Sequence, residues 1–495
     1  MYVGLDIGTS GTKAALIKEN GMVLKEHQIN YKFSNIRKGY RELDAQEVWM
    51  AVKECLHKVG HNQTVRTITV SALGEAIILL DRDGRILSPS ITGTDQRGTE
   101  EMDEICSRFQ KDYLTNITGL NMSAIYSANK IAWLKKHNKL LYEETWKIVT
   151  FQDFIIYKLT RETFIDYSMA SRTLLFDIQK NDWCEELLNS LGIQREKLST
   201  PVRGGSMVGK INRNAADELG ISSTIQIVAG THDHICNAIG SGTIHYGECT
   251  NTVGTTEGLT ALVNREQLNT KNIGTYQISC EPFVLPGMFN TVAWNNTSGV
   301  LLRWFSEEFI KKNKYKDLNK IYKELNARMC NEPTKLLVLP HFSGAATPYM
   351  DSRSKGAIVG LTLGTSSSEI YKALMEGANY ELALILDCLK KTGFRLSKMT
   401  ATGGALSSQL LQIKADILGV KIHTVKNKQT GTLGGAILGA VAVGDFDDLS
   451  DAVRHMVKMT DMYEPHEYRR KIYQERMLMY QKLYPMLADI NHELE

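Results

Sequence analysis

The sequence predicts an α/β protein built from two similar parts, and two observations support this. A chain of 495 residues is too long for one hydrophobic core, because single cores stop growing beyond about 250–300 residues. Each half also begins with a strand, a turn of small residues and a second strand, at residues 2–18 and again at 249–263. We place the two parts at residues 1–245 and 246–495, divided next to the flexible Gly240-Ser241-Gly242.

The composition is ordinary for a globular protein in water. Hydrophobic residues make up 43% of the chain, charged residues 23%, and the net charge is +3. No run of Lys and Arg is long enough to indicate nucleic-acid binding. Residues 1–8 lack a secretory signal, and the stretch 434–444 is too short to span a bilayer. The eight cysteines form no CxxC pair. We therefore expect a cytoplasmic protein with neither nucleic-acid nor membrane partners.

Periodicity and turn residues predict the remaining elements. Asn20-Gly21 indicates a tight turn between strands at 14–17 and 22–26. Helical periodicity lies within 42–60, and apolar strands follow at 67–71 and 225–229. The second half adds a strand at 336–339, a helix at 366–391 and a strand at 398–400. The tail 463–495 is helical and amphipathic, and we expect it to pack on a domain through Tyr473, Met477, Tyr480 and Leu483.

The turn between the first two strands carries groups that suit phosphate binding. Asp6 stands at the strand end, where a carboxylate can hold a hydrated Mg²⁺. Glycines let backbone amides approach an anion, and hydroxyls and a lysine add further donors. We expect the phosphate contacts to come from Gly8, Thr9, Ser10, Thr12 and Lys13. The alternative is an ordinary hairpin turn, since Gly, Ser and Thr favour turns.

A second turn of the same kind, Gly254–Gly258, lies between strands in the other half. Two such turns, one in each half, could bind one polyphosphate across a cleft. The segment Gly204–Lys210 almost matches a Walker A loop, but Ile211 replaces the required Ser or Thr. The preceding residues 200–203 also read as a turn, so we do not predict a P-loop.

Asp233 is the candidate general base. It follows the apolar strand 225–229 within Gly230–His234 and precedes a helical segment, a position from which a carboxylate can orient an alcohol and accept its proton. The alternative is simple helix capping. His232 and His234 suggest a metal site with His245, but no second Cys or His cluster accompanies them. We expect His234 to line the substrate pocket and His232 to pack in the core.

These motifs together resemble those of the FGGY carbohydrate kinases, a family that includes xylulokinase, glycerol kinase, gluconokinase and ribulokinase. The resemblance covers residues 2 to about 444. The matching segments are Asp6–Lys13 and Asn251–Glu257 for phosphate, Gly230–Asp233 for the catalytic base, Thr402–Ala405 for adenosine, and the signature segments Ser127–Trp133, Gly344–Gly377 and Gln429–Ala436.

The resemblance implies two ribonuclease-H-like domains of the actin/hexokinase type, with ATP and Mg²⁺ in an interdomain cleft that closes around a sugar. Residues 1–245 would bind the sugar and supply the base, and residues 246–495 would bind ATP. Asp233 would be the general base and, with Asp6, would hold Mg²⁺. The other nucleotide contacts implied are Gly254, Thr255, Gly403, Gly404 and Ser408, the last where the family often has Asn.

The acceptor is predicted from a few polar positions. Glu75 matches the acid of glycerol kinases, although Gly74 replaces their Arg, and Thr94–Arg97 resembles an Asn-Asp-Gly-Arg motif. Carboxylates at Glu75 and Asp95 suit neighbouring hydroxyls. We favour a neutral ketopentose such as xylulose over gluconate, whose carboxylate the two acids would repel, although Arg97 could compensate. The expected sugar contacts are Glu75, Asp95, Arg97, His234, Trp294 and Asn296.

Several alternatives stay open. The acceptor could instead be L-fuculose, erythrulose, glycerol or another polyol, or gluconate. An ATPase switch related to actin and the heat-shock chaperones would use the phosphate turns without a sugar site, and a pseudokinase would bind without catalysis. Glu75, Asp95, Asp233 and the family signatures argue against the switch. The retained Asp6, Asp233, Gly254 and Thr255 argue against the pseudokinase. Homodimers are common in the family, but no segment indicates an interface.

Overall fold

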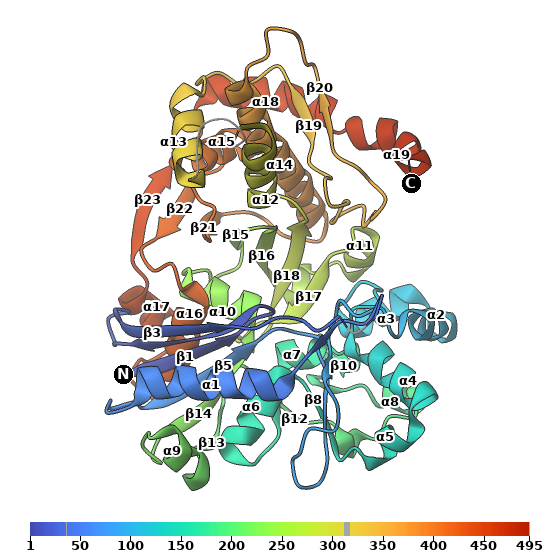
Figure 1. Ribbon diagram of the computed structural model, residues 1–495, viewed down its shortest axis with the longest axis vertical. Coiled ribbons are helices and arrows are strands. Elements are labelled where there is room, and N and C mark those ends of the chain that lie inside the picture. The colour runs from blue at the N-terminus through green and yellow to red at the C-terminus, as the bar shows by residue number, and fades with distance from the viewer. Residues whose placement is uncertain (36, 311–316, 495) are drawn as a thin grey trace.

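The computed structural model, which describes residues 1–35, 37–310 and 317–494, contains two large sheets (Figure 1). In spatial order, the six strands of the first sheet are β13 (Met207–Lys210), β14 (Gln226–His232), β5 (Thr67–Ala72), β1 (Tyr2–Ile7), β2 (Gly11–Ile17) and β3 (Val23–Asn30). The seven strands of the second are β17 (Ser279–Pro282), β18 (Met288–Asn295), β16 (Glu257–Asn264), β15 (Glu248–Val253), β21 (Lys398–Thr402), β22 (Ile422–Val425) and β23 (Met459–Tyr463).

The two sheets repeat one five-stranded arrangement. In the first, β1 pairs antiparallel with β2 and parallel with β5, while β3 and β14 extend the two sides. In the second, β15 pairs antiparallel with β16 and parallel with β21, while β18 and β22 extend the sides with the same directions. This confirms the predicted α/β class and its internal duplication, and the order is that of an actin-like, ribonuclease-H-like fold.

Helices cover the sheets at positions close to those predicted. Asp44 caps α1 (Ala45–Gly60) by accepting a hydrogen bond from the Gln46 amide at 2.8 Å. Gly21, with φ of +78°, makes the tight turn between β2 and β3. The longer helices of the second half are α13 (Leu318–Arg328), α14 (Ser367–Lys391), α15 (Ser408–Leu418), α16 (Thr430–Ala442), α18 (Glu467–Tyr480) and α19 (Leu483–Glu493).

The first half also carries a helical region beside its sheet. Its helices are α2 (Thr99–Arg108), α3 (Lys111–Thr118), α4 (Ser127–His137), α5 (Lys139–Glu144), α6 (Phe151–Thr160), α7 (Tyr167–Ser171), α8 (Glu185–Leu191) and α9 (Arg213–Leu219). The shorter helices near the junction are α10 (Asp233–Gly240), α11 (Thr270–Thr275), α12 (Gly299–Phe305) and α17 (Leu449–Met456). Among the described residues, no helix combines the length and hydropathy needed to cross a membrane.

Helix α16 comes from the second half of the chain but packs on the first sheet. It contacts β1, β2, β5 and α10, and in Figure 1 its orange ribbon lies beside blue strands. Small residues make this contact possible: a Cβ on Gly434 would lie 1.8 Å from the Cys236 carbonyl oxygen of α10. The division at residue 245 remains a prediction for the chain, but in space the second half contributes this helix to the first.

The amphipathic tail packs as expected. Tyr473 and Tyr480 of α18 are buried, and their hydroxyls donate to Glu376 and Glu381 of α14. Residues 459–463, however, form strand β23, so the tail becomes helical only at Glu467.

The Walker-like segment is not a P-loop. Residues 207–210 are strand β13, and the next helix, α9, begins only at Arg213. The prediction of a turn at residues 200–203 was wrong in part, because Thr200–Val202 forms strand β12, which pairs parallel with β9 (Phe164–Asp166).

Replacing Gly434 with Ala should destabilise the protein by about 1–3 kcal/mol, because the added methyl group overpacks the α10–α16 contact. On an exposed helix the same change stabilises by about 1 kcal/mol, since Ala is the better helix former. The sign of the change is therefore diagnostic. Chemical denaturation of the variant checks it, and an unchanged or raised free energy of unfolding would contradict this packing.

Candidate active site

Two cavities meet at Asp233. The larger, about 390 Å³, is lined by residues of the first half together with Val292 and Trp294 of β18. The smaller, about 250 Å³, lies beside the start of α16 and the end of β21. Asp233 and His234 line both. Of the predicted site residues, the larger cavity also contains Thr9, Glu75 and Trp294, and the smaller contains Asp6 and Gly403.

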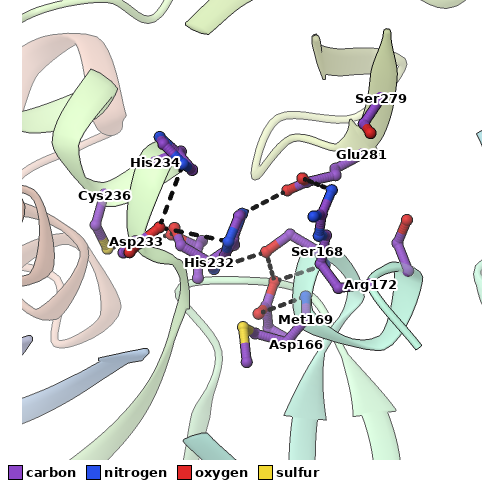
Figure 2. A network of polar contacts seen from close by, with 12 residues as sticks. Asp166, Ser168, Met169, Arg172, His232, Asp233, His234, Cys236, Ser279 and Glu281 are labelled. Carbon is purple, nitrogen blue, oxygen red and sulfur yellow. Dashed lines mark hydrogen bonds and ion pairs between the residues drawn. The ribbon is translucent and has the colours of Figure 1, made fainter. Parts of the chain in front are cut away.

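The strand-to-helix junction places Asp233 at the base of the cleft. β14 ends at His232, and Asp233 is the first residue of α10. The carboxylate is 36% exposed, and its Oδ1 lies 3.4 Å from His232 Nε2 and 3.9 Å from His234 Nε2. Burial lowers the pKa of His234, against the opposing charge of Asp233, so that imidazole is neutral at pH 7. Figure 2 shows both rings next to the carboxylate, and their centres lie 5.1 Å from each other.

His232 is a cation in this setting. Burial by itself would lower its pKa, but the carboxylates of Glu281 and Asp233 outweigh it and raise that pKa to about 9. Its Nδ1 lies 3.1 Å from Glu281 Oε2. His232 also lines the larger cavity, in addition to the core packing expected of it.

Asp6 lines the smaller cavity and is the most strongly perturbed carboxyl group in its lining. Burial and the nearby Asp233 carboxylate raise the pKa of Asp6 to about 7, although Lys13 opposes the shift. Among the described residues, the buried Oδ1 atoms of Asp6 and Asp233 have no hydrogen-bond partner. Two close carboxylates with orphaned oxygens are suited to Mg²⁺, which prefers such ligands. These residues fit a divalent cation.

The first predicted phosphate turn, Asp6–Lys13, is fixed by hydrogen bonds within the turn and to Tyr31. The Gly8 amide donates to the Gly11 carbonyl at 2.9 Å, and Tyr31 donates its hydroxyl proton to the Gly8 carbonyl at 2.7 Å. Ser10 is exposed at the tip, whereas Thr12 is buried with its hydroxyl 3.3 Å from that of Tyr31. Thr12 therefore supports the turn from behind. Lys13 Nζ donates to Gln429 Oε1 at 2.5 Å, next to the start of α16.

The second predicted phosphate turn, Gly254–Gly258, lies against α12 and against Thr402–Ala405, the segment predicted to bind adenosine. The Gly299 amide donates to the Gly254 carbonyl at 3.0 Å, and Thr255 is exposed. Gly403 has φ of +110°, and a Cβ there would lie 2.2 Å from the Val253 carbonyl oxygen. Only glycine fits at this position. Behind the turn, Lys414 of α15 forms a fully buried ion pair with Glu257 of β16.

Of the predicted nucleotide contacts, only Thr9 and Gly403 line one of the two cavities. Gly404 and Ser408 are among those that lie apart from them. Gly404 is exposed next to Gly403, with no atom within 4 Å of the position of an added Cβ. Ser408 begins α15 and lines a third cavity of about 310 Å³, together with Asn326 and Met329. Both remain predictions for the adenosine side of the site.

Glu75 enters the larger cavity from an unusual backbone conformation. Its φ is +65°, in the left-handed region. Arg172 binds its carboxylate through Nη2 and through Nε, the latter at 2.5 Å from Oε1. Gly74 stands where glycerol kinases have an Arg. In this protein Arg172, the residue after α7, places a cation beside Glu75.

Asp95, Arg97 and Asn296 do not line either cavity. The Asp95 side chain is fully buried, and its carboxylate accepts hydrogen bonds from the Arg97 guanidinium and from the Arg41 and Arg97 amides. These partners lower its pKa despite burial. Asn296 donates to the Ser343 carbonyl at 3.3 Å. In this conformation all three support neighbouring segments, and their sugar contacts remain predictions.

Sequence reasoning missed three charged residues near the site. Arg172 and Arg41 line the larger cavity, and Glu281 is buried behind it. Arg41 stacks on Phe33, with its guanidinium carbon 4.3 Å from the ring centre. None stands in a phosphate-binding or strand-end motif, so only tertiary contact identifies them.

The duplicated fold, with phosphate-type turns and a strand-end carboxylate facing one cleft, defines the actin-like class of sugar kinases. The model of the N-terminal domain of the FGGY family of carbohydrate kinases matches residues 1–240, and that of the C-terminal domain matches residues 249–443. The chain belongs to this family and is an ATP-dependent carbohydrate kinase.

Several family members resemble the whole chain to a similar degree. It is 24% identical over 492 residues to a xylulose kinase of Staphylococcus xylosus, covering 97% of this chain and 99% of that protein. It is 26% identical over 503 residues to a gluconokinase of Bacillus subtilis, covering 98% and 96%. A ligand-bound xylulose kinase structure from Lactobacillus acidophilus matches with a TM-score of 0.91 at 24% identity, covering 100% and 99%.

A Plasmodium falciparum glycerol kinase structure with ADP matches with a TM-score of 0.87 at 21% identity, covering 97% of each chain. The family rests on the two domain models, and the solved structures confirm the fold. These levels of identity do not distinguish between xylulose, gluconate and glycerol as the acceptor.

Replacing Asp6 with Asn should stabilise the ligand-free protein more at pH 8 than at pH 4.5. An acid whose folded pKa is raised loses stability as it ionises, so the penalty grows above the ordinary value of 3.8 and is complete above about pH 7. We expect the variant to melt about 1–3 °C higher relative to wild type at pH 8. Melting curves without nucleotide or divalent cation test this, and equal shifts at the two pH values would contradict the raised pKa.

Proposed function

We propose that this carbohydrate kinase transfers the γ-phosphoryl group of ATP to a hydroxyl of a small neutral sugar, a ketopentose such as xylulose. One observation carries the proposal: Asp233 lines both cavities, so a single carboxylate faces a space beside Glu75 and a space beside Asp6. The larger cavity, about 390 Å³, is in the range of small-molecule sites.

In the proposed reaction, Asp233 orients the acceptor hydroxyl and accepts its proton as the oxygen–phosphorus bond forms and the bond to the ADP oxygen breaks. The neutral His234 ring borders both cavities and can donate a hydrogen bond without adding charge. Asp6 and Asp233 would hold Mg²⁺, which when bound neutralises charge on the phosphates. Gly8 and Gly254 would let the polyphosphate approach the backbone closely, and Gly403 lets its own turn pack against Val253.

Sugar recognition would depend on Glu75. Its carboxylate, oriented by Arg172, can accept hydrogen bonds from neighbouring hydroxyls. The Trp294 and Phe33 rings give the same cavity apolar surfaces for the C–H faces of a sugar. Trp294 belongs to the second half, so closure of the two halves would complete the pocket and exclude water, the competing acceptor.

A sugar acid such as gluconate is the second candidate, and a specific observation favours it. The repulsion expected from two acidic side chains is reduced, because Arg172 balances Glu75 and the Asp95 carboxylate is held by Arg97 outside the cavity. Arg41 also lines the cavity and could pair with a carboxylate. The gluconokinase relative is compatible with this alternative.

The deciding experiment is coupled ADP release with Mg²⁺-ATP across a panel of acceptors. The panel contains D- and L-xylulose, D- and L-ribulose, L-fuculose, erythrulose, glycerol, pentitols and gluconate. We expect one ketopentose to raise turnover far above the background without sugar. The largest rate with gluconate would select the second candidate, and equal turnover with and without every acceptor would favour an ATPase switch.

Replacing Asp233 with Asn should lower kcat by about 10²–10⁴-fold, the usual cost of losing a general base. The isosteric amide keeps the fold but accepts no proton. Steady-state kinetics with the best acceptor measures the loss, and calorimetric titration with ATP checks that nucleotide binding is retained. A near-wild-type kcat would remove Asp233 from its proposed role.

Replacing Glu75 with Gln should raise KM for the sugar by roughly tenfold or more, since a charged hydrogen bond contributes about 1.5–3 kcal/mol. KM for ATP should stay unchanged. Asp95→Asn provides the comparison, because its carboxylate lies outside the cavity and should affect stability more than sugar KM. Equal changes in both KM values for Glu75→Gln would place Glu75 outside the sugar site.

A further inference from the structure

A chain of charged side chains connects Glu75, in the larger cavity, to the candidate base Asp233. Figure 2 shows the part of it from Arg172 to Asp233. Arg172 contacts Glu75 with Nε and Nη2, and its Nη1 lies 3.3 Å from Glu281 Oε1. The other oxygen of Glu281 lies 3.1 Å from His232 Nδ1, and His232 Nε2 lies 3.4 Å from Asp233 Oδ1. The chain therefore runs Glu75, Arg172, Glu281, His232, Asp233.

Glu281 is the one member of this chain from the second half. It lies on the edge strand β17, its side chain is fully buried, and its two oxygens are divided between two cations of the first half. The strand is fixed in place, because the Cys280 amide donates to the Gly119 carbonyl at 2.7 Å and Ser279 Oγ lies 3.2 Å from the Tyr126 hydroxyl. Glu281 thus holds a set position against the first half.

The backbone and the ring of His232 are held by different groups. Its amide donates to Ser168 Oγ at 2.9 Å, and Ser168 in turn donates to Asp166 at 2.8 Å. The ring contacts Glu281 on one nitrogen and Asp233 on the other. Glu281 therefore sets the ring orientation, which places Nε2 at 3.4 Å from Asp233 Oδ1.

We infer that Glu281 is a positioning residue that acts across the two halves, orienting Asp233 through His232 and Glu75 through Arg172. The inference rests on the proposed function of Asp233 and Glu75. Fixing one oxygen of the base leaves the other for the acceptor hydroxyl, and a small misalignment at this step is costly, about 10²-fold for 1 Å. One buried carboxylate would thereby align the base and the sugar contact with each other.

The chain of side chains has two arms, one from Glu281 through His232 to Asp233 and one from Glu281 through Arg172 to Glu75. The two arms predict different kinetic effects. His232→Gln breaks only the arm to the base, so kcat should fall about 10- to 100-fold while KM for the sugar changes less than about twofold. Glu281→Gln weakens both arms, so kcat should fall similarly and sugar KM should rise roughly tenfold. KM for ATP should be unchanged in both, and the kcat losses in the double variant should not add, because the residues act in one path.

Glu381→Gln is the matched control. It makes the same substitution in a second buried His–Glu pair, with His341 Nε2 at 3.3 Å from Glu381 Oε1, away from both cavities of the site. It should lower the melting temperature without the kinetic split. If Glu281→Gln does not fold, His232→Gln carries the test, because it leaves the Arg172–Glu281 pair in place.

The assay uses the full-length enzyme and the acceptor found by the panel. Wild-type kcat in both variants, additive losses, or the same effects in Glu381→Gln would overturn the inference while leaving the kinase assignment intact. A wild-type enzyme that phosphorylates no acceptor would instead remove the proposed function, and the inference with it.

Discussion

The arrangement of the site depends on close backbone packing between β1, α10 and α16. Glycines let these elements approach without intervening side chains, as at Gly434, where a Cβ would overlap a carbonyl of α10. The carboxyl end of β1 and the first turns of the two helices consequently meet at one edge of the first sheet, and Asp6, Asp233 and Thr430 line the same cavity. Larger side chains at these contacts would push β1 and the two helices apart, and Asp6 and Asp233 would no longer line one cavity.

This convergence concentrates charge, and the fold balances it unevenly. Glu75 and Glu281 are paired with Arg172 and His232, which orient their carboxylates. Asp6 is balanced only in part by Lys13, so burial and the nearby Asp233 carboxylate raise its pKa. A site that stabilised every acid with protein cations would have little affinity for a metal–nucleotide complex. The partly compensated carboxylate is the kind of local instability that binding sites commonly retain.

The parts of the fold and site that follow from local rules could be predicted from sequence. The duplicated strand–turn–strand units, the strand-end position of Asp6 and the strand-to-helix position of Asp233 all depend on short segments. The sugar side could not be predicted as well. Asp95 is held by Arg97 only two residues away, and Glu75 by Arg172 nearly a hundred residues away. No periodicity or turn signal encodes the contact of Glu75, because it depends on where tertiary packing places α7, the helix that precedes Arg172.

The position of α16 also has a consequence for dividing the molecule. The helix has buried residues on all its sides and fills the space between α10 and the first sheet, although it lies in the last quarter of the sequence. Residues 1–245 made alone would leave that surface open to water, and residues 246–495 would carry an apolar helix that has lost its contacts with α10 and the first sheet. Reconstitution from two fragments should therefore succeed only by complementation, with the C-terminal piece supplying part of the interior of the N-terminal one.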